Sequence, residues 1–319
     1  MNRLLVSNGL ILDPVTQSVK TSNVYIADGN IIAIDHEPVG FEADRSIDAT
    51  GLIISPGLVD LSARLREPGL EFKADIHSEV TAAASAGITT LCCPPDTDPV
   101  IDEPAVVELI HRKAANAAHA HVVMLGALTR GLEGHLLSEM ATLKAAGCIG
   151  VSNSRRPVAN TLILRRAYSY AASCDITLFI EPDEHWLSTG GCAHDGKVAT
   201  RLGLQGIPVS AETVAISRAL ELILETGARA HFGRLSSAHG VELIRHAKER
   251  GMAITADVSA HQLFLSEMDI NSFNSMCHVL PPLRSQRDME ALREAVKDGV
   301  IDAICSDHQP HEPDAKQAP

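Results

Sequence analysis

From residue 56 onward, short apolar runs alternate with longer amphipathic segments, and this alternation constrains the fold more than any other feature of the chain. Eight runs of strand length are expected at residues 58–65, 89–95, 121–129, 148–153, 176–182, 228–236, 253–261 and 303–308. Helices are expected between them at residues 75–87, 103–117, 133–147, 160–174, 211–227, 239–251 and 286–299. Five of these segments end in a glycine suited to a left-handed cap: Gly87, Gly147, Gly227, Gly251 and Gly299. The pattern predicts an α/β fold, a parallel (β/α)₈ barrel of the TIM type.

An open, doubly wound sheet is the alternative for such a pattern. No Gly-x-Gly-x-x-Gly follows the first strand, so the barrel is favoured. After the last strand, residues 311–319 are polar and lack a helical pattern, so we expect the eighth helix to be missing.

The first part of the chain has a different pattern. Short β-rich runs at residues 4–6, 23–26, 31–34 and 52–54 are separated by turn signals such as Asn8-Gly9 and Asp28-Gly29. We therefore expect a small β-sheet domain over residues 1–55 and a barrel over residues 56–319.

Charge and cysteine content narrow the class of protein. With 27 basic and 40 acidic residues the formal charge is −13, which argues against nucleic acid or an anionic membrane as partner. No run approaches the roughly 18 apolar residues of a membrane span. The 7 cysteines are an odd number without a C-x-x-C pair, which indicates reduced thiols and a cytoplasmic protein.

The carboxyl ends of the strands carry the most specific motifs, and in such barrels the chemistry gathers there. Four segments are informative in combination: Pro56-Gly57-Leu58-Val59-Asp60, Leu65-Arg66-Glu67-Pro68-Gly69, Pro281-Pro282-Leu283-Arg284-Ser285 and Ser306-Asp307-His308. With them the chain resembles the dihydroorotase branch of the amidohydrolase superfamily. The resemblance implies a metal-bearing barrel beside a small β-sandwich built from both chain ends, the C-terminal part of which is expected to be missing here. It also implies the reversible cyclisation of N-carbamoyl-aspartate to dihydroorotate in pyrimidine synthesis.

The family's metal-ligand positions hold mostly other residue types in this chain. They are Ser62 and Arg64 for the His-x-His of strand one, Asn153 on strand four, Glu181 on strand five, Arg234 on strand six, and the family's own aspartate, Asp307, on strand eight. Zinc needs imidazole, thiolate or carboxylate ligands, whereas arginine stays protonated and has no available lone pair. We therefore expect the family zinc to be lost, and with it the activated water of the ordinary mechanism.

The substrate side matches the family only in part. Arg66 keeps the position that the family uses for the substrate carboxylate, and His311 lies near another. In contrast, the family's Pro-Asn-Thr is Pro-Asp-Thr at Asp96, and its asparagine before Pro-Pro-Leu-Arg is Leu280. Arg66 and His311 are thus the substrate-binding candidates, and Asp307 is the family's catalytic position, expected to be inert.

The loss of a metal would leave buried carboxylates unpaired, which is costly. We expect Arg64 and Arg234 to point into the mouth of the barrel and to pair with Asp307 and Glu181. His308, which follows the family aspartate, is expected to fill part of the same space.

Three functions are compatible with these residues. The first, implied by the resemblance, is a non-catalytic dihydroorotase-like subunit that supports aspartate carbamoyltransferase, as in some bacteria, or that assembles with itself. The second is an active cyclic-amide hydrolase that uses Asp307 with Arg64 or Arg234 as an unusual site. The third is a sensor that binds a pyrimidine intermediate through Arg66.

Overall fold

The computed structural model describes residues 2–316 and divides into two compact units, one ending at Leu58 and one beginning at Val59. The first unit is a mixed sheet in the order β3-β2-β1-β4, with β5 also paired to β1. Its strands are β1 (Arg3–Asp13), β2 (Ser18–Ala27), β3 (Asn30–Ile34), β4 (Arg45–Asp48) and β5 (Ile53–Ile54). The expected N-terminal sheet is therefore confirmed.

The sequence patterns did not predict β4, because this strand has only four residues and most of them are polar. It pairs in parallel with β1, as β5 does. At the irregularity in β1, a Cβ on Gly9 would lie 2.3 Å from Cδ1 of Ile54, so a larger residue there would require the Ile54 side chain to move.

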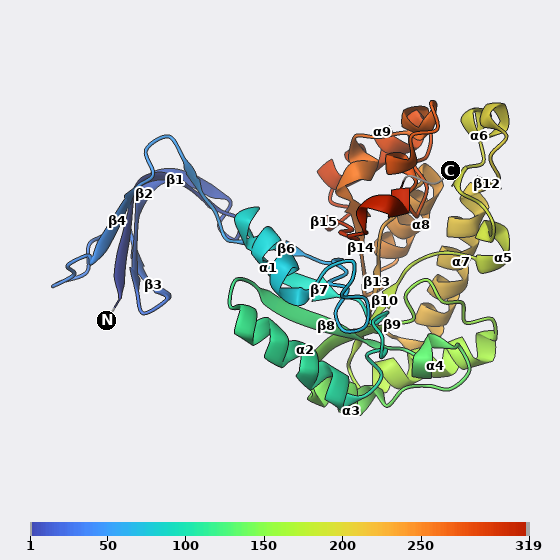
Figure 1. The fold of residues 1–319 in the computed structure, drawn as a ribbon, viewed down its shortest axis with the longest axis horizontal. Coiled ribbons are helices and arrows are strands. Elements are labelled where there is room, and N and C mark those ends of the chain that lie inside the picture. The colour runs from blue at the N-terminus through green and yellow to red at the C-terminus, as the bar shows by residue number, and fades with distance from the viewer. Residues whose placement is uncertain (1, 317–319) are drawn as a thin grey trace. The chain divides into compact units, whose positions relative to one another are not determined.

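The second unit is built on an eight-stranded parallel sheet in the order β15-β14-β13-β10-β9-β8-β7-β6 (Figure 1). The strands are β6 (Leu58–Asp60), β7 (Ile88–Cys93), β8 (His121–Ala127), β9 (Cys148–Ser152), β10 (Thr177–Ile180), β13 (Ala230–Phe232), β14 (Ile254–Ser259) and β15 (Ala303–Cys305). All eight expected strands are present, each shorter than or about as long as expected.

The first and last strands meet through the segments that follow them, which makes the barrel nearly closed. Ala63 and His308 form a parallel β-bridge. Asp60 accepts a hydrogen bond from the backbone N–H of Ser306 at 2.9 Å and another from its hydroxyl. The (β/α)₈ prediction is confirmed by this closure.

Seven main helices follow the expected order. They are α1 (Ile76–Ser85), α2 (Pro104–Ala117), α3 (Met140–Ala145), α4 (Thr161–Ser173), α7 (Val209–Thr226), α8 (Ala238–Glu249) and α9 (Gln286–Lys297). The five glycines expected at helix ends all have positive φ, for example 68° at Gly227. After β15, the described residues contain only the short 3₁₀ turn η5 (Pro313–Lys316).

The prediction of a helix over residues 133–147 is wrong for its first half. A 3₁₀ turn, η1 (Arg130–Leu132), precedes the segment, which becomes helical only at Met140. Gly134 has φ of 77°, and a Cβ there would lie 2.5 Å from the carbonyl oxygen of Pro157. This close tertiary contact, invisible in the amphipathic pattern, holds the segment in a loop.

Two strand-to-helix connections form a small subdomain that the sequence did not reveal. The first contains α5 (His185–Ser188), β11 (Ala193–His194), α6 (Lys197–Leu202) and β12 (Gly206–Ile207). The second contains the 3₁₀ turns η2 (Ala260–Leu263), η3 (Glu267–Ile270) and η4 (Ser275–Cys277). They share an apolar cluster made of Ala193, Val198, Ala199, Ile270 and Leu283. No helix or strand in either connection is longer than the 6 residues of α6, which is too short for a recognisable period.

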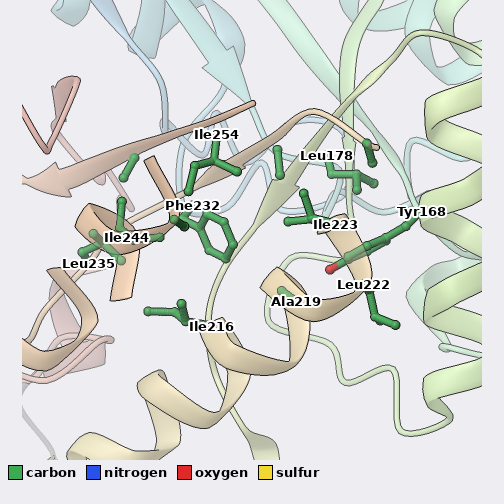
Figure 2. Close-up of a cluster of buried hydrophobic side chains, with 14 of the residues drawn as sticks. Tyr168, Leu178, Ile216, Ala219, Leu222, Ile223, Phe232, Leu235, Ile244 and Ile254 are labelled. Atoms are coloured by element: carbon green, nitrogen blue, oxygen red, sulfur yellow. The ribbon is translucent and has the colours of Figure 1, made fainter. Parts of the chain in front are cut away.

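The main core lies between the barrel strands and their helices and is largely aliphatic. Phe232 of β13 is fully buried, among residues that include Ile216 of α7, Ile244 of α8 and Ile254 of β14 (Figure 2). This packing anchors β13, whose carboxyl end carries one of the arginines described below.

The C-terminal cap of α2 offers a small, clean stability test. Ala118 has φ of 56° and ψ of 23°, the left-handed conformation that glycine fills at the end of α7. We expect Ala118→Gly to raise the free energy of unfolding by about 0.5–1 kcal/mol, because glycine removes the Cβ strain. Ala115→Gly, inside the same helix, should instead lower the free energy of unfolding by about 1 kcal/mol. Urea unfolding measures both variants. A loss of stability in Ala118→Gly would contradict the assignment of this cap.

Candidate functional site

Six charged side chains converge where six of the eight barrel strands end. They are Arg64 after β6, Asp96 after β7, Arg155 after β9, Glu181 after β10, Arg234 after β13 and Asp307 after β15. Because the strands are parallel, their carboxyl ends open on one mouth of the barrel. We call these six residues the arginine–carboxylate cluster.

Arg234 lies at the centre of the cluster. Its Nη1 donates to Oδ1 of Asp307 at 2.7 Å, and its Nη2 pairs with Oε2 of Glu181. Gln309 also donates to Oδ1 of Asp307, at 2.8 Å. The carboxylate of strand eight is thus held by neighbours on both sides.

Arg64 and Arg155 complete the cluster. Arg64 donates from Nε to Oδ2 of Asp96 at 2.8 Å, and its two terminal nitrogens lie 3.7 Å from Glu181 and 3.8 Å from Asp307. Nε of Arg155 lies 3.4 Å from Oε2 of Glu181. Arg155 also donates to the carbonyl oxygen of Leu280, in the connection after β14. Three guanidinium groups therefore face three carboxylates.

Arg64, Arg234 and Asp307 of the cluster are buried, whereas Asp96, Arg155 and Glu181 are partly exposed. Burial raises the pKa of Asp307, but the charge and hydrogen bond of Arg234, with the charges of Arg155 and Arg64, outweigh it, so the pKa lies below its usual value. Burial and the charges of Arg234 and Arg64 lower the pKa of Arg155 to about 9. Arg155 is therefore still charged at neutral pH, and Asp307 is a poor general base.

The expectation that Arg64 and Arg234 pair with Asp307 and Glu181 is confirmed by these contacts. Sequence reasoning missed the other two members. Arg155 lies three residues past the end of β9, and Asp96 lies three past the end of β7. A search for charged residues just after every strand, not only at metal-ligand positions, would have found both.

The backbone at the cluster adopts conformations that few side chains tolerate. Arg234 has φ of 57° and Asp307 has φ of 52°, both in the left-handed region. Such conformations cost about 1–3 kcal/mol each and persist where the surroundings impose them. Here the two strained residues are the ones whose side chains pair with each other.

The residues at the family's ligand positions do not fit a metal ion. Two of these positions hold arginines, which repel a divalent cation and offer no lone pair. Asn153 uses its side chain to fix the loop, accepting from Thr129 Oγ1 at 2.6 Å and donating to the carbonyl oxygen of Arg156 at 3.0 Å. Within residues 2–316, no three His, Cys, Asp or Glu side chains gather in a way that could hold a metal.

The two substrate-binding candidates lie next to each other. Nη2 of Arg66 is 3.3 Å from Nε2 of His311, and Nε of Arg66 donates to the carbonyl oxygen of Pro310 at 2.9 Å. Burial and the charge of Arg64 lower the pKa of Arg66, while burial and Arg66 lower the pKa of His311. In this structure the guanidinium of Arg66 binds the segment after β15.

The expectation for His308 is wrong. Its ring lies outside the cluster and pairs with Glu79 of α1, with 44% of the side chain exposed. The backbone of His308 is held by two hydrogen bonds: its N–H donates to the carbonyl oxygen of Ser62, and its carbonyl oxygen accepts from the N–H of Arg64. With the backbone fixed in this way, the His308 ring lies outside the cluster.

A cavity of about 340 Å³ lies beside the cluster and is lined in part by Arg155, Arg234 and Arg284. Arg284 donates to the carbonyl oxygen of Ile207 at 2.5 Å and to Oγ of Ser236 at 3.2 Å. The guanidinium groups that border this cavity are thus already paired within the protein.

Comparisons with known proteins agree with these motifs. Residues 51–239 match the family described as Dihydro-orotase-like. A dihydroorotase-like protein of Pseudomonas aeruginosa is 49% identical over 309 residues, which span 97% of this chain and 73% of that protein. A dihydroorotase of Syntrophotalea carbinolica is 40% identical over 314 residues, which span 98% of this chain and 74% of that protein.

The fold is also found in solved structures. The L-hydantoinase (dihydropyrimidinase) from Arthrobacter aurescens matches 99% of this chain and 71% of its own chain with a TM-score of 0.86 and 24% sequence identity. At this identity the match shows the shared architecture alone. Among the described residues, no helix has the length and apolar character needed to cross a membrane.

Proposed function

Because the chain belongs to the dihydroorotase-like family, we propose that it is a non-catalytic member that acts in pyrimidine synthesis as a structural or regulatory subunit of aspartate carbamoyltransferase. The observation that carries this proposal is the arginine–carboxylate cluster, which occupies the mouth of the barrel where the family's chemistry would take place. We also propose a cytoplasmic location, in keeping with seven cysteines that are all free in the structure.

The alternative of an unusual active hydrolase finds little support in the geometry. Such an enzyme needs a base that can activate water at neutral pH. Asp307 accepts hydrogen bonds from Arg234 and Gln309, and its pKa lies below the usual value against the opposing effect of burial. Arg64 donates to Asp96, and Arg234 donates to Asp307 and pairs with Glu181, so both guanidinium groups already face carboxylates of the protein rather than an open substrate site.

The decisive experiment is co-purification with the transferase. The full chain, carrying an affinity tag, is co-expressed with the aspartate carbamoyltransferase of the same organism and analysed by size-exclusion chromatography with light scattering. We expect one complex of defined stoichiometry to elute ahead of either protein alone. Arg66→Ala serves as a control, because a scaffold does not need the former carboxylate-binding residue, and this variant should form the same complex.

Two results would contradict the proposal. One is separate elution of the two proteins at micromolar concentration. The other is a rise in melting temperature with dihydroorotate or carbamoyl-aspartate that Arg66→Ala abolishes, in the absence of any complex. That second result would favour the sensor, for which the cavity beside Arg155 and Arg234 is the only structural support in the residues described.

A further inference from the structure

The arginine–carboxylate cluster connects parts of the chain that are far apart in sequence. Its members follow strands one, two, four, five, six and eight of the barrel, and the contact between Arg64 and Asp307 joins residues 243 positions apart on either side of the closure. Backbone hydrogen bonds link each strand only to its neighbours. The cluster instead joins strand one to strand five and strand six to strand eight across the mouth.

We propose that the arginine–carboxylate cluster stabilises the folded barrel at its mouth without a metal ion. Because its ion pairs connect strand ends across the mouth, we call it the ring below. Arg64, Arg155 and Arg234 supply the positive charge opposite Asp96, Glu181 and Asp307, of which Asp307 is the most deeply buried. This property goes beyond the proposed function, since it concerns how the fold is held and does not depend on any partner.

The balance of charge is central to the proposal. Asp307 has 2% of its side chain exposed and Arg234 has 4%, so neither charge is solvated by bulk water. Removal of one partner from such a buried pair leaves the other charge uncompensated, whereas removal of both does not. The ring is therefore expected to tolerate balanced losses better than single ones.

Arg155 gives the ring its third cation. Without it, Glu181 would have only Arg64 at 3.7 Å and Arg234 as counter-charges, and these two also serve Asp96 and Asp307. Burial, followed by the neighbouring charges of Arg234 and Arg64, lowers the pKa of Arg155. Arg155 has 28% of its side chain exposed, so its replacement should lower the melting temperature less than replacement of Arg234.

A double-mutant cycle on the purified full chain tests the proposal, with the melting temperature as the readout. We expect Arg234→Met and Asp307→Asn each to lower it on the order of 10 °C, and the double variant to lose clearly less than the sum of the two. Arg155→Met should show a smaller loss. The melting temperature of the wild-type chain should be unchanged by EDTA and by added zinc.

A surface pair of similar geometry is the matched control. Arg165 of α4 donates to Glu225 of α7 at 2.6 Å, with 49% of each side chain exposed. Arg165→Met should lower the melting temperature by less than about 3 °C, because exposed pairs contribute little. If Arg234→Met fails to fold, recovery of a cooperative transition in the double variant supports the ring, and no recovery overturns it.

Other outcomes would also overturn the proposal. Single losses no larger than that of Arg165→Met would show that the cluster carries no net stability. Strictly additive losses would show that the charges do not act together. A chelator-sensitive melting temperature would show that a metal ion, and not the ring, holds the mouth. None of these readouts depends on the transferase, so they are separate from the test of the proposed function.

Discussion

Purified protein supplied with zinc is expected to show no metal-dependent hydrolysis of dihydroorotate, with a rate at least about 10⁴-fold below that of an active relative. The physical reason lies in the side chains at the mouth of the barrel. Arg64 and Arg234 lie at two positions where the resemblance implies metal ligands, and both are paired with carboxylates of the protein. Because a guanidinium group cannot bind zinc, we expect that the water required by the family's reaction is not activated here.

The measurement combines metal content per chain with a hydrolysis assay after growth in zinc-supplemented medium. A dihydroorotase relative, purified in the same way, provides the positive control and shows that the procedure retains bound metal. About one zinc ion per chain, together with activity that EDTA removes, would show that the assignment of these ligand positions is wrong. Zinc without activity would place the ion elsewhere on the chain and leave the catalytic prediction intact.

Glu212→Ala is expected to lower the free energy of unfolding by at least about 3 kcal/mol, because it leaves several buried donors without an acceptor. Glu212 lies in α7 with 2% of its surface exposed. It accepts hydrogen bonds from the backbone N–H groups of Ser236 at 2.8 Å and Ser237 at 3.1 Å, and from both hydroxyls. Ser237 is also the N-cap of α8.

Glu212→Ala should also disturb the arginine–carboxylate cluster, because the loop residues bonded to Glu212, Ser236 and Ser237, closely follow Arg234 in the chain. Glu212→Gln keeps one acceptor oxygen and should lose less stability than Glu212→Ala. Glu221, exposed on the same helix, is the matched control, and Glu221→Ala should change the free energy of unfolding by less than about 0.5 kcal/mol. Urea unfolding measures all three. A loss below about 1 kcal/mol in Glu212→Ala would show that the buried carboxylate is not needed by this loop.

Gly240 gives an independent check on the same contact. A Cβ added there would lie 2.1 Å from Oε1 of Glu212. The first turn of α8 can therefore approach the carboxylate only with glycine at this position. Spacing along the chain does not reveal such a requirement, since it depends on how α7 and α8 pack.

The sequence by itself determined the order and type of the main elements. Strands such as His121–Ala127 and helices such as α9 follow from apolar periodicity and from glycine caps, which are local properties of the chain. The motifs at the strand ends also identified the family. Because an arginine cannot ligate zinc in any fold, the misfit at Arg64 and Arg234 could be argued from residue identity alone.

Only the tertiary structure decided which charges meet. Arg155 and Asp96 joined the site because their strands end at the same mouth as those of Glu181 and Asp307. Arg66 was found against Pro310 and His308 against Glu79, although their positions in the sequence suggested other partners. The loop at residues 133–139 and the subdomain around Ala193 likewise depend on contacts between distant segments. Ion pairing, burial and close backbone approach depend on how distant segments pack, so local sequence patterns do not predict them.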